Sequence, residues 1–87
     1  MTRTRDETLI QAFSDVLRQE RDRLGLSQEA LAFECGIART YIGLLEAKKR
    51  QPALSILFAI ARGLALSPNT LIARVDKRFA ELLEAGR

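Results

Sequence analysis

The sequence predicts an all-α fold of five helices, and three observations support this prediction. Apolar residues recur at intervals of three or four positions, which is the spacing of one helix face. Glycine and proline punctuate the chain at Gly25, Gly36 and Pro52, where helices are expected to end or restart. Residues 28–46 read as two short helices joined by a tight turn. Eighty-seven residues suffice for one modest core, so we expect residues 1–87 to form a single domain.

Composition narrows the class of protein. The chain carries a net charge of +3, one cysteine and no histidine, so neither an internal disulfide nor a zinc site is expected. No apolar run approaches the length that spans a bilayer, and the charged N-terminal stretch has no apolar core of a secretory signal. These features predict a cytoplasmic protein without membrane partners.

The first helix is expected over residues 6–24. An apolar stripe follows this segment, and Gly25 ends it. Thr4 or Asp6 is expected to cap the helix, and residues 1–5 are expected to fray. The stripe consists of Leu9, Ile10, Phe13, Val16, Leu17 and Leu24.

The second and third helices form the predicted corner, at about residues 27–47. Ser27 is a credible N-cap for the second helix, and Gly36 suits the left-handed position that stops it. The facing apolar residues are Leu31, Ala32, Cys35, Ile42 and Leu45. The third helix is locally weak because Ala38 cannot cap it and Gly43 lies in its interior. Each feature costs about 1 kcal/mol.

Pro52 breaks the chain before a strongly apolar fourth helix, over residues 54–64. The pair Ser67–Pro68 then starts a fifth helix, expected over about residues 67–85. Its apolar positions are spaced like a heptad seam, which either packs back on Leu9, Ile10 and Phe13 or pairs with a second chain. Dimerisation is the favoured interpretation, with an interface of Ile72, Val75, Phe79, Leu82 and Leu83.

The third helix turns a second set of side chains outward: Arg39, Thr40, Tyr41, Gly43 and Leu44. Arginine is suited to bidentate contact with guanine, and threonine offers a hydroxyl and a methyl group for thymine. A basic run, Lys48, Lys49 and Arg50, follows directly and is placed to contact phosphates. A two-helix corner of this kind is typical of a DNA-reading element. A purely structural role stays open for three of these residues. It would be shielding the helix corner for Tyr41, accommodating neighbouring packing for Gly43, and forming the rim of the core for Leu44.

From about residue 13 to residue 71 the sequence resembles the Cro/XRE family of helix-turn-helix repressors. The matching positions are Gly25, Leu26, Ser27, Gln28, Leu31, Ala32, Gly36, Tyr41, Ile42, Glu46, Pro52, Leu57, Ile60, Ala61 and Leu64. The run from Arg39 to Ile42 is similar to the controller proteins of restriction–modification systems. The resemblance implies a lambda-repressor-like domain with an extended C-terminal helix.

The resemblance also implies roles for three residues of the corner. The Gln28 amide is expected to bind a backbone phosphate, unless it is merely solvated. Arg21 and Glu46 are expected to form a structural ion pair rather than two separate exposed charges. The implied function is transcription regulation by a homodimer on a palindromic operator in double-stranded DNA, at the nucleoid.

A rival function is a protein-interaction module, such as an antitoxin or a co-regulator that uses the C-terminal helix. Catalysis is not expected, since Cys35 takes an apolar position and no histidine, Gly-rich phosphate loop or carboxylate pair accompanies it. We therefore predict no enzyme activity, no cofactor, no metal and no small-molecule ligand.

Overall fold

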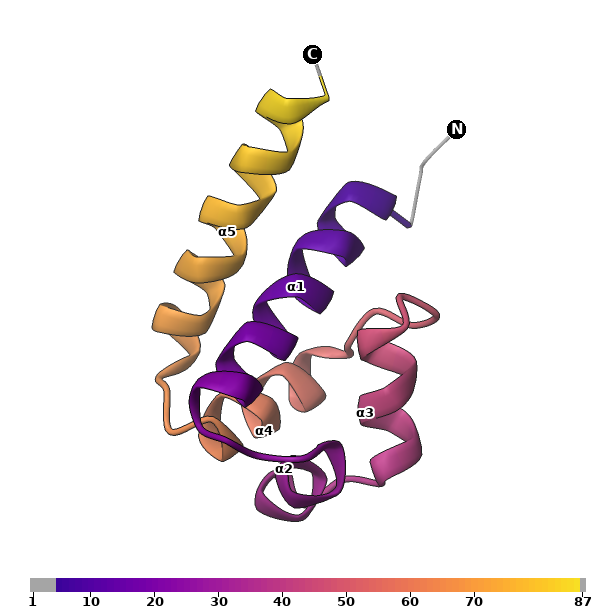
Figure 1. The fold of residues 1–87 in the computed structure, drawn as a ribbon, viewed down its shortest axis with the longest axis vertical. Coiled ribbons are helices and arrows are strands. Elements are labelled where there is room, and N and C mark those ends of the chain that lie inside the picture. The colour runs from indigo at the N-terminus through magenta and orange to yellow at the C-terminus, as the bar shows by residue number, and fades with distance from the viewer. Residues whose placement is uncertain (1–4, 87) are drawn as a thin grey trace.

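The computed structural model describes residues 5–86, and every regular element in that range is a helix (Figure 1). The predicted five-helix fold is confirmed, with boundaries within a few residues of expectation. Asp6 caps the first helix through a bond from the Leu9 N–H to Oδ1 at 3.1 Å, whereas Thr4 and residues 1–4 lie outside the described residues. The helices are α1 (Glu7–Arg23), α2 (Gln28–Cys35), α3 (Arg39–Glu46), α4 (Leu54–Gly63) and α5 (Pro68–Ala85).

The two long helices, α1 and α5, lie side by side and run in opposite directions, while α3 lies on the far side of α1 (Figure 1). Leu71 and Val75 of α5 are buried. Two ion pairs bind the charged flanks of the helices: Arg78 Nε to Asp15 Oδ2 at 2.9 Å and Arg74 Nη1 to Glu20 Oε2 at 2.6 Å. As one of the two expectations for α5 has it, this helix packs along α1 of its own chain.

The core lies where the helices converge. The largest fully buried apolar side chains come from all five of them: Leu17, Leu31, Ile42, Leu45, Ile60, Leu64 and Leu71. Between α2 and α4 the approach is close enough to require glycine. A Cβ atom at Gly63 would lie 2.3 Å from Cys35 Sγ.

Within residues 5–86 no single helix is long and apolar enough to cross a membrane. The pair α4 and α5 meets the length and composition of a span only jointly, with a bend of 102° at the break between the two helices.

Candidate nucleic-acid interface

The corner between α2 and α3 forms as the sequence predicts. Ser27 Oγ accepts from the Ala30 N–H at 3.0 Å and so caps α2, and Gly36 takes a left-handed conformation with φ +71° at its end. Leu31, Ala32 and Cys35 on α2, like Ile42 and Leu45 on α3, are all buried. The remaining faces of α3 are thereby fixed in orientation.

The predicted reading residues at the start of α3 differ in exposure. Arg39 and Thr40 are exposed, in the first turn of the helix. Tyr41 is half-buried and packs against the core, and Leu44 is half-buried one turn later. Arg39 and Thr40 are thus more exposed to solvent than Tyr41 and Leu44.

The N-terminus of α3 is as weak as the sequence suggests, because Ala38 offers no side-chain cap. Gly43 in the helix interior is not required by packing. A Cβ atom there would meet Gln28 Oε1 at 3.7 Å, an ordinary van der Waals distance. Among residues 5–86, therefore, no neighbouring side chain requires a glycine at this position.

The C-terminus of α3 is held at Glu46, where the expected ion pair is present. Arg21 binds its carboxylate through two bonds, Nε to Oε2 at 2.7 Å and Nη2 to Oε1 at 3.0 Å. A third bond runs from Arg21 Nη1 to the Leu26 carbonyl at 2.8 Å. Glu46 is 4% exposed, so this fork joins α1 to the end of α3 in a largely dry environment.

Two further side chains of α1 hold the backbone carbonyl of Glu46. The buried Ser14 donates from Oγ at 2.7 Å, and Arg18 donates from Nη2 at 3.0 Å. Neither contact is predicted from the sequence. Ser14 carries a detectable signal, because it is a polar residue within the apolar stripe of α1.

The charge state of Glu46 follows from these contacts. Burial alone would raise its pKa, but the hydrogen bonds from Arg21 and Gln28 and the charges of Arg21 and Arg18 outweigh burial. The net pKa of Glu46 is therefore below its ordinary value. In the same contact, the hydrogen bond to Glu46 raises the pKa of Arg21.

Gln28 is partly exposed to solvent and already has a hydrogen-bond partner within the chain. It is half-buried, and its Nε2 donates to Glu46 Oε1 at 3.0 Å. One N–H of the same amide group is left over from this bond. The contact aligns the Gln28 amide with the end of α3.

The basic loop after α3 begins with a strained residue. Lys48 has φ +63°, a left-handed conformation that costs about 1 kcal/mol in a residue with a Cβ atom. Its Nζ donates to Gln11 Oε1 at 2.9 Å, and its carbonyl accepts from Arg5 Nη2 at 2.9 Å. Lys49 and Arg50 are exposed. The Lys48 ammonium therefore already has a partner on α1, which distinguishes it from its two neighbours.

The predicted interface on α5 needs correction at Val75. This residue is 6% exposed and packs with Leu71 in the protomer core, so it offers a partner chain very little surface. Phe79 and Leu82 are half-buried against that same core, whereas Ile72 and Leu83 are 47% and 46% exposed. The apolar stripe is therefore used mainly within the chain.

Cys35 is a core residue, as the sequence suggests. It is 4% exposed, and burial raises the pKa of its thiol to about 11, which suppresses the nucleophilic thiolate. Among residues 5–86 no group of three or more histidine, cysteine, aspartate or glutamate side chains is arranged to hold a metal ion.

Comparison with known proteins agrees with the helix-turn-helix resemblance seen in the sequence. The sequence profile of the helix-turn-helix family matches residues 17–71. The control protein C.SmaI of Serratia marcescens is 43% identical over 58 residues, which cover 67% of this chain and 69% of that protein.

Two solved structures are similar as well. The restriction-modification controller protein C.AhdI of Aeromonas hydrophila has a TM-score of 0.68 and 37% identity, covering 71% of this chain and 94% of its own. The controller C.Esp1396I was solved as a tetramer with its natural 35 base-pair operator. It has a TM-score of 0.77 and 29% identity, and the match covers 83% of this chain and 95% of that chain. The chain therefore belongs to the XRE-type helix-turn-helix family of DNA-binding regulators.

Proposed function

We propose that this chain is a sequence-specific transcriptional regulator that binds a palindromic operator as a homodimer. The observation that carries the proposal is the geometry of α3: Arg39 and Thr40 are exposed at its start, while Glu46 is anchored at its end. An anchored helix with exposed polar side chains can present them to base edges in a fixed orientation. The relatives named above as control proteins support a regulatory role.

In this proposal affinity and selectivity come from different residues. Lys49 and Arg50, exposed beside α3, bind phosphates, and Lys48 joins them when its ammonium leaves Gln11. Gln28 uses its remaining N–H on a phosphate, with Glu46 setting its orientation. Arg39 and Thr40 read base edges, while Tyr41 and Leu44 contact the groove wall. Gly43 lets the helix backbone approach the duplex.

The proposed palindrome has two equivalent half-sites, which a two-fold symmetric dimer would match. Two copies related by a two-fold axis would place their α3 helices about 34 Å apart, one turn of duplex. C.Esp1396I, solved as a tetramer on its operator, is a relative that assembles on DNA. We place this chain in the cytoplasm at the nucleoid, with residues 1–87 acting as one DNA-binding unit and without enzyme activity.

The proposal is tested by comparing Arg39→Ala with Lys49→Ala in titrations on specific and random duplexes at two salt concentrations. Arg39→Ala is expected to weaken specific binding by about 1–3 kcal/mol and to leave random binding nearly unchanged. Lys49→Ala is expected to weaken both and to lower the salt slope by about one. Lys77→Ala removes the same charge from an exposed site on α5 and serves as the matched control.

Equal losses of specific and random binding in Arg39→Ala would contradict base reading by that residue. Loss of binding in Lys77→Ala as large as in Lys49→Ala would contradict a phosphate-binding loop at residues 48–50. A wild-type chain that binds no duplex above background would instead favour the protein-interaction module.

A further inference from the structure

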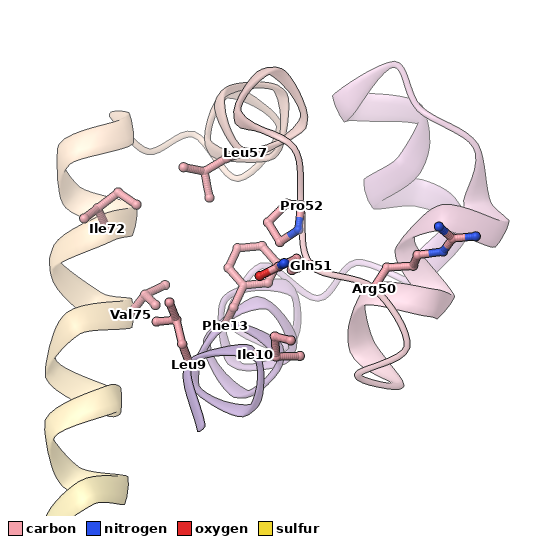
Figure 2. A pocket seen from close by; sticks show the side chains of 9 residues that line it. All are labelled: Leu9, Ile10, Phe13, Arg50, Gln51, Pro52, Leu57, Ile72 and Val75. Carbon is pink, nitrogen blue, oxygen red and sulfur yellow. The ribbon is translucent and has the colours of Figure 1, made fainter. Parts of the chain in front are cut away.

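The three cations of the basic loop after α3 differ in how they are held. Lys49 and Arg50 are exposed, and the Arg50 guanidinium extends away from the apolar side chains that α1, α4 and α5 bring together, on the side of α3 (Figure 2). Lys48 is different, because its Nζ donates to Gln11 Oε1 on α1 at 2.9 Å. Its backbone carbonyl also accepts from Arg5 Nη2 at 2.9 Å. Both the backbone and the side chain of Lys48 are therefore bonded to the first residues of the described chain.

The Gln11 side chain has one orientation that satisfies both of its neighbours. Its Nε2 donates to Asp15 Oδ1 at 2.8 Å, while its Oε1 accepts from Lys48. A carboxylate only accepts hydrogen bonds and an ammonium only donates them, so turning the amide over would lose both bonds. Gln11 and Asp15 are four positions apart and share one face of α1. Asp15 therefore holds the Gln11 amide with its oxygen toward Lys48.

Asp15 is held in turn by α5. Arg78 Nε donates to Asp15 Oδ2 at 2.9 Å, and the Asp15 side chain is 14% exposed. Arg78 also donates from Nη1 to Glu81 Oε1 at 3.2 Å, one turn further along α5. The contact at Lys48 is thus the end of a network that crosses α1. The members of the network, in order, are Lys48, Gln11, Asp15, Arg78 and Glu81.

The bond to Gln11 fixes the position of a charge without cancelling it. Gln11 is neutral, so the Lys48 ammonium keeps its full charge while it is held against α1. A phosphate beyond the reach of the held ammonium is bound only after this bond is broken. The free energy of the bond is then subtracted from the free energy of DNA binding.

We propose that Gln11 is a positioning residue for DNA binding, which holds the Lys48 ammonium against α1 until a backbone phosphate takes it. The inference rests on the proposed function, in which residues 48–50 bind phosphates. Phosphate contacts carry no sequence information, so the restraint lowers the affinity for specific and random duplex alike. Asp15 and Arg78 act through Gln11 by fixing its amide.

The first measurement tests the restraint in the free chain, without DNA. The folded protein is acetylated to low conversion with an acetyl ester reagent, and the modified lysines are located by tandem mass spectrometry. In the wild type Lys48 should react at least about twofold more slowly than Lys49, because its ammonium gives up a hydrogen bond first. In Gln11→Met the two rates should become similar. Gln19→Met removes an exposed amide from the same helix and should change neither rate.

The second measurement is titration of a labelled random-sequence duplex at low salt. Gln11→Met should bind about threefold to tenfold more tightly than the wild type, because no bond is broken when Lys48 reaches a phosphate. The same substitution in a Lys48→Met background should change nothing, since no ammonium is left to release. Gln19→Met is again the matched control. Circular dichroism and urea unfolding check that every variant is folded.

Equal acetylation of Lys48 and Lys49 in the wild type would overturn the proposal. So would unchanged or weaker duplex binding by folded Gln11→Met, which would give Gln11 a role in stability alone. An equal gain in the Lys48→Met background would also overturn it, because the gain would not pass through Lys48.

The outcomes separate this inference from the proposed function. A slow Lys48 and the expected gain on random duplex, in a chain that selects no palindrome, support this inference and contradict the proposed function. A selected palindrome with unchanged duplex affinity in Gln11→Met contradicts this inference and leaves the function standing. A wild type that binds no duplex overturns both.

Discussion

Gly43→Ala should make the folded chain more stable and its complex with DNA weaker. Alanine is favoured over glycine in a helix interior by about 1 kcal/mol, and Gly43 lies well inside α3. The added Cβ atom would be 3.7 Å from Gln28 Oε1, an ordinary contact distance, so no neighbour among residues 5–86 opposes it. A gain of about 1 kcal/mol corresponds to a rise of about 4–8 °C in Tm for a domain of this size.

The same Cβ atom would lie beside Gln28, a side chain that the proposal assigns to a DNA phosphate. We expect binding to a specific duplex to fall about tenfold, or about 1.4 kcal/mol. The assays are thermal unfolding followed by circular dichroism and fluorescence anisotropy with labelled duplex.

Gly63→Ala is the matched control, because a Cβ atom there would lie 2.3 Å from Cys35 Sγ and 3.1 Å from the Cys35 backbone nitrogen. That variant should lose about 1–3 kcal/mol through overpacking. A lower Tm in Gly43→Ala would contradict the open space around Gly43. A stabilised variant that binds DNA as well as the wild type does would contradict close approach of the helix backbone to the duplex.

Three further outcomes are expected. Glu46→Ala should cost about 3–5 kcal/mol in urea unfolding, because Arg21 is left charged and largely buried; a loss under 1 kcal/mol would contradict the anchoring role. Ala65→Gly should raise the unfolding free energy by about 0.5–1 kcal/mol, because Ala65 has φ +58° in the link between α4 and α5, and an unchanged or lower value would argue against strain there. Glu20 and Glu46 both have a lowered pKa, so their stabilisation is present above the ordinary value of 4.5 and is lost as pH falls through their folded pKa values. The urea midpoint should therefore drop below pH 4.5 in the wild type and drop less in Glu46→Ala; parallel profiles would contradict the assignment.

Local signals account for most of the fold that the sequence predicts. Asp6 and Ser27 cap helices, Gly25 and Gly36 take left-handed conformations after them, and Ser67–Pro68 begins α5, each by a short-range rule. Such features depend on neighbouring residues alone. A single sequence is therefore sufficient to place them.

The partners of the site residues depend on contacts between distant segments and were harder to predict. Gln28 reaches Glu46 across 18 positions, and Lys48 reaches Gln11 across 37. The spacing of α5 was ambiguous for a different reason: residues three and four apart share a face whether that face meets α1 or a second chain. Leu71, which lies outside the predicted interface, is fully buried, while Ile72, the first residue of that interface, is exposed.

Sequence reading by α3 is best tested by selecting binding sites for the wild-type chain from a random duplex library, followed by titration at two salt concentrations. The expected result is a palindrome with half-sites about ten base pairs apart, bound far more tightly than random duplex. Weak binding without any enriched sequence would contradict sequence reading by α3 and would leave this helix a structural role only.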